Sequence, residues 1–257
     1  MVKKRSVSWL LVKAAAVCLT ATAFLTLWDT PGHVQEPTPD VGLLTQVSGE
    51  VSFWNKTAQK EPSRPQSFMK VRRGDHFKLP TGAIIQLLYF DNGRQETWKG
   101  PVTFRCDDKE SISTAKTSTG EVKPEVKFLS SRVSQRLMTA PLPLPSSSIR
   151  YSGTIQTMAP KCAPEPVLKM PGPPSAETKK MIEEAQKTCR NLANQATPDD
   201  VTPELYYLGV LAEHCQYREM EAVVDAMLAK RPGDPALKDL KAWAQALSTT
   251  KPSQQNK

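Results

Sequence analysis

A run of apolar residues from Ala83 to Phe90, interrupted only by Gln86, constrains the fold of this chain more than any other stretch. A strand this apolar is covered on both faces, so we expect it in the middle of its domain. Thr81-Gly82 precedes the run, and Asp91-Asn92-Gly93 follows it. An Asn-Gly pair between two strands is a strong hairpin signal, because both central residues of the favoured turn need positive φ. The sequence therefore predicts a hairpin built on a central strand.

Further short strands are predicted on both sides of this run. Residues 47–54 alternate between two faces, which is typical of a half-buried strand, and residues 68–73 alternate in the same way. Residues 94–98 return from the hairpin, and a last strand covers residues 102–106. We therefore predict a small all-β domain at residues 43–122, with about five to seven strands that close as a barrel or sandwich.

The turns of this region resemble those of the FecR-like β domain of bacterial envelope proteins. The matching motifs are Gly49-Glu50-Val51, Arg73-Gly74-Asp75, Leu79-Pro80-Thr81-Gly82, Asp91-Asn92-Gly93 and Gly100-Pro101-Val102. The resemblance covers roughly residues 43 to 115 and implies a periplasmic binding or adaptor domain with no known chemistry. Signalling members of that family resemble anti-sigma regulators with a cytoplasmic helical domain before the membrane segment, whereas only about six residues precede it here. We therefore expect no control of a sigma factor.

The first 28 residues predict export. Lys3, Lys4 and Arg5 precede an apolar run from Val7 to Trp28 that holds one charge, Lys13. Two interpretations remain open, a signal peptide cleaved after residue 23 and an uncleaved anchor long enough to cross a bilayer, and we favour the anchor. The predicted location is the bacterial inner membrane, single-pass with the body in the periplasm, or the periplasm itself if the segment is cleaved. Residues 29–42 are predicted to be a linker.

The net charge of +8 gives little support to a nucleic-acid function. Four of the 34 basic residues lie in the first 28 positions, where there are no acidic residues, so the rest of the chain carries 30 basic against 26 acidic residues. No basic stripe with interleaved aromatic residues follows. We therefore expect no nucleic-acid partner.

The second half of the chain is predicted to be a spacer followed by helices, which makes the fold class α+β and multidomain. Residues 123–174 are rich in proline, which removes backbone donors and fixes φ, so they are predicted to be a stiff spacer. Within the spacer, residues 126–138 could form a short helix and residues 149–158 an added strand. Residues 175–249 show helical periodicity with four starts, and residues 250–257 are a polar tail.

Part of the helical region is similar to a tetratricopeptide repeat. The matching residues are Leu208-Gly209, Tyr217, Pro232 and Asp234-Pro235-Ala236. They cover one repeat, whose turn is one residue short and which has Cys215 and Met220 where small residues are usual. Such repeats imply a protein-binding surface, for which Tyr206, Tyr207 and Tyr217 are the candidate residues; the alternative is a docking pad or cap on the β domain.

The cysteines are candidates for disulfides, because export leads to an oxidising compartment. Cys189 and Cys215 are predicted on the apolar faces of consecutive helices and form the favoured pair. Cys106 would then pair with Cys162, and the alternative is that some of these thiols stay free. No metal site and no cofactor are expected, since the chain has no Cys-x-x-Cys spacing and its three histidines are scattered.

Two function classes remain open at this point. The first is a non-catalytic cell-envelope adaptor or scaffold that binds another envelope protein through the helical module, the β domain or both. The second is a module that binds cell-wall or other glycans through Trp54 and Trp98, which fall on the polar sides of their strands. Both indoles could equally close the ends of a small β core. No motif of a known enzyme class accompanies them, so we expect no catalysis.

Overall fold

The computed structural model describes residues 39–55, 62–114, 116–117, 120–145 and 174–249. The chain divides into two units, residues 1–37 and 38–257, and the first lies outside the described residues. Within the described ranges, no helix is long and apolar enough to cross a membrane. The predicted anchor of residues 1–28 and the predicted added strand of residues 149–158 both fall outside these ranges.

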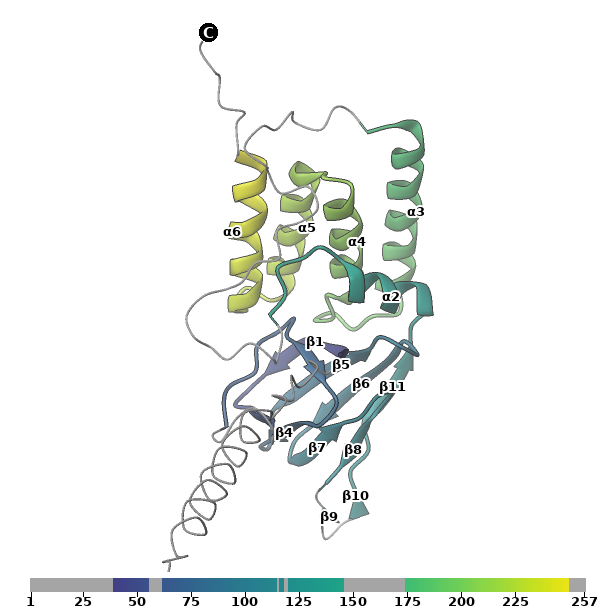
Figure 1. The fold of residues 1–257 in the computed structure, drawn as a ribbon. Coiled ribbons are helices and arrows are strands. Elements are labelled where there is room, and N and C mark those ends of the chain that lie inside the picture. The colour runs from purple at the N-terminus through teal and green to yellow at the C-terminus, as the bar shows by residue number, and fades with distance from the viewer. Residues whose placement is uncertain (1–38, 56–61, 115, 118–119, 146–173, 250–257) are drawn as a thin grey trace, which may run out of the picture. The chain divides into compact units, whose positions relative to one another are not determined.

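A five-stranded antiparallel sheet carries the predicted central strand (Figure 1). Its order is β11-β6-β5-β1-β3, with β1 at Asp40–Ser48, β3 at Lys70–Arg72, β5 at Ile84–Tyr89, β6 at Arg94–Lys99 and β11 at Glu125–Phe128. Strand β5 lies between β6 and β1, which confirms the prediction from its apolar run. Strand β11 corrects the predicted boundary at residue 122, because it pairs with β6 from inside the predicted spacer.

The β5–β6 hairpin is confirmed, but its turn is not the predicted one. Among the described non-glycine residues only Phe68 and Cys215 have positive φ, so Asn92 does not, whereas Gly93 has φ of 67°. A Cβ at position 93 would lie 2.3 Å from the carbonyl oxygen of Leu129. Glycine is required at this position for both reasons.

A second antiparallel sheet faces the first and has the order β2-β4-β7-β8. The strands are β2 at Ser52–Asn55, β4 at Asp75–Leu79, β7 at Val102–Cys106 and β8 at Ser111–Ser113. A short hairpin follows, with β9 at Lys116–Thr117 and β10 at Gly120–Glu121. Aromatic side chains fill the space between the two sheets, where Phe77 packs against Phe53 and Phe104.

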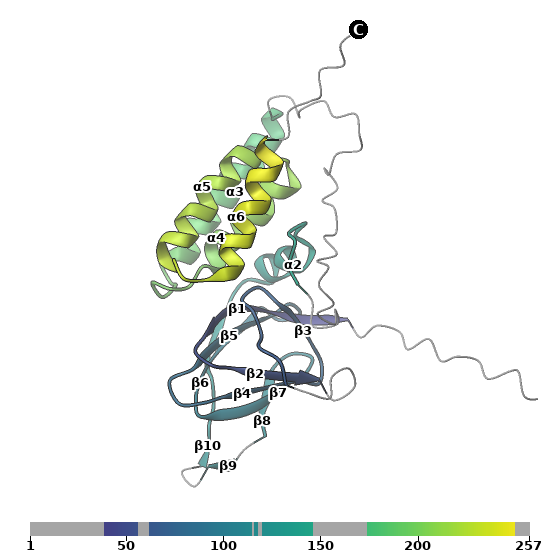
Figure 2. The ribbon, with the colours of Figure 1, turned by 90° about the vertical axis from the view of Figure 1, so that its left-hand side faces the viewer.

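Five helices follow the strands in the described part of the chain. They are α2 at Ser131–Thr139, α3 at Ala176–Ala193, α4 at Thr202–Glu213, α5 at Tyr217–Lys230 and α6 at Pro235–Thr249. The four helix starts predicted after residue 174 are confirmed. The short helix predicted at residues 126–138 exists, but it begins at Ser131, because the first of these residues belong to β11. Figures 1 and 2 both show α2 between the strands and the other helices.

The helices and the five-stranded sheet share one hydrophobic core. Leu43, Leu88 and Phe90 belong to the same buried cluster as Leu137 of α2 and Leu205 of α4. The neighbouring residues of β1 and β5 point the other way, into the space between the two sheets. The five-stranded sheet is therefore covered on both faces, which is why β5 has no polar face.

Candidate functional site

Strand β6 carries two different polar sites, one on each face. Because side chains alternate along a strand, Glu96 and Trp98 point into the space between the sheets, and Gln95 points toward the helices. Glu96 and Gln95 are both buried. Buried polar groups need hydrogen-bond partners, and the two faces provide them in different ways.

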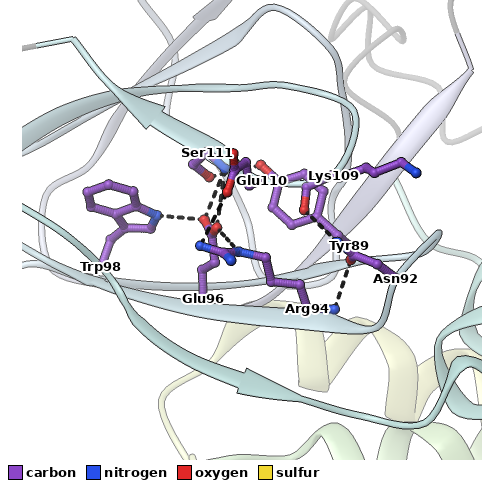
Figure 3. Close-up of polar contacts among 8 residues, drawn as sticks. All are labelled: Tyr89, Asn92, Arg94, Glu96, Trp98, Lys109, Glu110 and Ser111. Carbon is purple, nitrogen blue, oxygen red and sulfur yellow. Dashed lines mark hydrogen bonds and ion pairs between the residues drawn. The ribbon is translucent and has the colours of Figure 1, made fainter.

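The inner face holds a buried carboxylate that is fully satisfied. Figure 3 shows Arg94, Trp98 and Ser111 converging on Glu96. Arg94 Nε donates to Glu96 Oε1 at 2.6 Å, and Trp98 Nε1 donates to Oε2 at 3.0 Å. The backbone N–H of Ser111 lies 3.2 Å from both carboxylate oxygens. These donors tie β6 to β8, and they make Glu96 a cross-link between the two sheets.

Tyr89 and Cys106 extend this network as uncharged groups. The hydroxyls of Tyr89 and Ser111 form a hydrogen bond of 2.9 Å. Burial raises the pKa of Tyr89 far above its ordinary value, and it raises the pKa of Cys106 as well. Both side chains therefore stay protonated at neutral pH, and the inner face of β6 holds the sheets together.

The outer face of β6 opens into a cleft of about 350 Å³ between β11 and the α3–α4 connection, here called the β11 cleft. Its apolar lining consists of Phe128, Leu129, Leu192, Ala196 and Pro203. Its polar lining consists of Gln95, Lys127, Gln195, Asp200 and Thr202. The cleft has the volume of the smaller ligand sites in proteins. Like those sites, it is lined by apolar side chains together with a few polar groups.

Gln95 holds the inner wall of the β11 cleft in place. Its Nε2 lies 3.3 Å from Asp200 Oδ2 and 3.1 Å from Thr202 Oγ1. Asp200 Oδ1 accepts from the backbone N–H of Thr202 at 2.9 Å. Asp200, and not Thr202, therefore satisfies a free amide at the start of α4, since the helix begins at Thr202 itself.

The outer rim of the β11 cleft is formed by an exposed edge strand. Phe128 is 67% exposed, and Val126 on the same face of β11 is 38% exposed. Lys127 points to the other face, and its Nζ donates to the carbonyl oxygen of Gln195 at 3.3 Å. Glu125 forms an ion pair of 2.7 Å with Lys99. Phe128 lies opposite Arg94 in the β11–β6 ladder, so its side chain is on the face of Arg94 and not on the Lys127 face that borders the cleft. An apolar side chain this exposed on an edge strand is typical of an interaction site.

The candidate glycan contacts are not brought together on one surface. Trp98 is only 1% exposed and stacks on Phe104 with ring centroids 4.6 Å apart. Trp54 is half-buried and stacks on His76 at 5.4 Å. Trp98 therefore cannot offer an open indole face to a glycan, because it lies on the inner face of β6, where its Nε1 donates to the buried Glu96 carboxylate.

The three candidate tyrosines have different environments. Tyr206 is buried in the shared core and has no surface to offer a partner. Tyr207 and Tyr217 are half-buried, and burial raises the pKa of each. None of the three lines the β11 cleft, so the tyrosines and the cleft are separate features.

The predicted disulfide pairs do not form in this structure. Cys106 and Cys189 are free, whereas Cys215 is disulfide-bonded, and Cys162 lies outside the described residues. Cys215 follows the end of α4 with φ of 57°, so it is not on the helix face where it was predicted opposite Cys189. Cys106 points into the space between the sheets, beside Tyr89.

Sequence reasoning missed the β11 cleft for identifiable reasons. Glu125-Val-Lys-Phe128 alternates charged and apolar residues, a strand signal that the surrounding prolines obscured. The contact of Gln95 with Asp200 and Thr202 leaves no local signal at all. Within the described ranges, no group of His, Cys, Asp and Glu could hold a metal ion.

Comparison with protein-family models, with curated proteins and with solved structures finds no match to this chain.

Proposed function

We propose that this chain is a non-catalytic adaptor of a bacterial cell envelope, which binds a partner polypeptide at the β11 cleft. The single observation that carries the proposal is the exposure of Phe128 on the edge strand β11, whose other face forms the rim of an apolar cleft. Burying Phe128 against a partner would contribute about 1.5–3 kcal/mol to binding. On the opposite face of β11, the cleft of about 350 Å³ has room for another side chain of the same partner.

The finer fold assignment is part of the same proposal. The two packed sheets are compatible with a FecR-like β domain, and the antiparallel helices α4 and α5 with one tetratricopeptide-like repeat. The repeat alone offers little concave surface. The β11 cleft is built by both parts, with Phe128 from the sheet and Leu192 and Ala196 from α3 and its C-terminal connection. We therefore place partner binding there and not on the repeat.

The location follows from the first 28 residues. We propose that they hold the protein in the inner membrane with the body in the periplasm, or direct it to the periplasm if they are cleaved. The partner is then another envelope protein. The glycan alternative loses support, because Trp98 is enclosed between the two sheets.

Affinity capture with the full chain tests the proposal. A tagged full-length protein is crosslinked in intact cells, and both captured proteins and captured glycans are identified. Phe128→Asp removes the exposed ring, and Ile112→Asp is the matched control because Ile112 is also exposed, at 41%, on the other sheet. We expect one defined protein that is lost with Phe128→Asp and kept with Ile112→Asp. Capture of that protein by both variants, or of glycans alone, would contradict the proposal.

A further inference from the structure

Strand β11 is the outermost strand of its sheet, and its outward backbone groups can be assigned from the ladder. The N–H of Leu129 donates to the carbonyl oxygen of Gly93 at 2.9 Å, which directs the Leu129 amide toward β6. In an antiparallel ladder, hydrogen-bonded and non-hydrogen-bonded pairs alternate. Lys127, opposite Gln95, therefore bonds to β6, whereas Val126 and Phe128, opposite Glu96 and Arg94, direct their N–H and C=O groups away from it.

These outward groups form a short template for another strand. In the described part of the chain, β11 pairs with β6 alone. The outward N–H and C=O of Val126 and Phe128 can form four hydrogen bonds with an added strand. Peptides that add a strand to an exposed sheet edge gain affinity from such backbone bonds and specificity from alternate side chains.

The side chains of β11 indicate which kind of strand would fit. Val126 and Phe128 lie on one face and are both exposed, so the added strand needs apolar side chains at alternate positions on that face. On the other face, Glu125 is paired with Lys99, whereas the hydrogen bond of Lys127 is to an uncharged carbonyl. An acidic residue between the two apolar ones would lie on the side of Lys127 and the cleft.

We propose, building on the adaptor function above, that the partner binds by adding an extended segment of the pattern apolar–acidic–apolar to the free edge of β11. Its apolar side chains cover Val126 and Phe128. Its acidic side chain pairs with Lys127 at the mouth of the β11 cleft. The adaptor thus recognises a strand of its partner and not a folded surface.

Val126→Pro tests this mode of binding. Proline removes the outward N–H of Val126, and it is tolerated on an edge strand where that group faces solvent. Val126→Thr is the matched control because it keeps the N–H and nearly the same shape. A random linear peptide library displayed on phage is selected against the full-length protein in detergent, and the enriched peptides are synthesised. Their affinities for the parent and both variants are then measured, with circular dichroism confirming that each variant is folded.

We expect the enriched peptides to have the apolar–acidic–apolar pattern. Their affinity is expected to fall at least tenfold with Val126→Pro, which corresponds to about 1.4 kcal/mol. With Val126→Thr it is expected to fall less than threefold, which corresponds to about 0.7 kcal/mol. Selection against Lys127→Glu is expected to replace the acidic residue by a basic one. Failure to enrich peptides, or equal affinity for the folded Val126→Pro variant, would overturn the added strand. The captured envelope protein distinguishes the two proposals: loss with Phe128→Asp but not with Val126→Pro supports the adaptor function and refutes strand addition.

Discussion

Gln95 Nε2 donates a hydrogen bond of 3.1 Å to Thr202 Oγ1, and the two residues are 107 positions apart in the sequence. The bond joins the five-stranded sheet to the start of α4. Because both residues line the β11 cleft, the cleft exists only when the sheet and the helices are assembled together. The stability of the contact between the sheet and α4 is therefore linked to the binding function.

Gln95→Ala is expected to lower the free energy of unfolding by about 1–3 kcal/mol, since it leaves Asp200 and Thr202 with one donor fewer in a buried site. Urea unfolding followed by circular dichroism measures the change. Thr97→Ala is the matched control, two positions along the same face of β6 and half-buried. Equal free energies of unfolding of the two variants would show that the Gln95 hydrogen bonds do not stabilise the contact between the sheet and α4.

Glu96→Gln is expected to lower the free energy of unfolding by about 3 kcal/mol. The amide cannot accept from Arg94, Trp98 and Ser111 with both of its atoms, and it leaves the charge of Arg94 without its buried partner. Glu125→Gln removes a carboxylate from the exposed pair with Lys99 and is expected to leave the melting temperature unchanged. A small effect of Glu96→Gln would mean that the network in Figure 3 contributes little.

Cys106 and Cys189, the free cysteines of the described residues, are expected to react slowly with iodoacetamide in the folded protein. Burial, followed by the nearby Glu204 carboxylate, raises the pKa of Cys189 to about 11. The thiolate is the reactive form, so at pH 8 about one Cys189 in a thousand is reactive, and the rate rises about tenfold per pH unit toward the pKa. Cys106 stays unmodified because it is buried and its pKa is raised further. Mass spectrometry of the peptides, with the urea-unfolded chain as control, measures both rates; fast labelling of folded Cys189 at pH 8 would contradict the environment described.

The buried guanidinium of Arg231 is expected to contribute little to stability. Its side chain is 10% exposed, and one of its terminal nitrogens lies 3.5 Å from an Asp234 carboxylate oxygen. Within the described residues, the guanidinium nitrogens have no hydrogen-bond partner, and the guanidinium carbon lies 5.4 Å from the centre of the Phe68 ring. Burial lowers the pKa of Arg231, which reflects the cost of its charge in this place.

The double variant Arg231→Met with Asp234→Ser tests this expectation, because serine can keep the cap that Asp234 Oδ1 provides to the amide of Ala236 at 3.0 Å. Replacing a buried ion pair with an apolar side chain is often neutral or stabilising. We expect the free energy of unfolding to stay within about 1 kcal/mol of the parent value or to increase. A loss of several kcal/mol in thermal or urea unfolding would show that the pair is needed.

The sequence predicted the elements that have a local signal. The apolar run of β5 implied cover on both faces. The helical periodicity from residue 175 placed the start of α3 correctly, and there the Ser175 hydroxyl accepts from the backbone N–H of Thr178 at 3.1 Å. What covers the second face of the sheet could not be read, because Leu88 and Leu205 meet only through the tertiary fold. The domain pattern suggested a spacer from residue 123 onward, whereas β11 and α2 are packed against the sheet and the helices within its first part, at residues 125–139.

The candidate site was much less predictable than the fold. Trp54 and Trp98 were selected because strand alternation put them on polar faces, which were expected to face solvent. The polar face of β6 is instead buried, because Glu96 lies between the sheets and accepts a hydrogen bond from the Trp98 indole. Cys215 was placed on a helix that ends before it. The β11 cleft depends on residues from β6, β11, α3 and α4, and no spacing in the sequence relates them.

The most direct measurement is site-specific photo-crosslinking from position 128 of the full-length protein in intact cells, with position 112 as the control. A photoreactive phenylalanine analogue replaces Phe128 with little change of shape, and Ile112 is comparably accessible on β8 of the other sheet. If the β11 cleft binds a polypeptide, position 128 forms a covalent adduct with one defined protein, the attachment site lies in an extended segment of that protein, and position 112 gives no such adduct. Adducts of equal yield from both positions, or none from position 128, would contradict binding at the cleft.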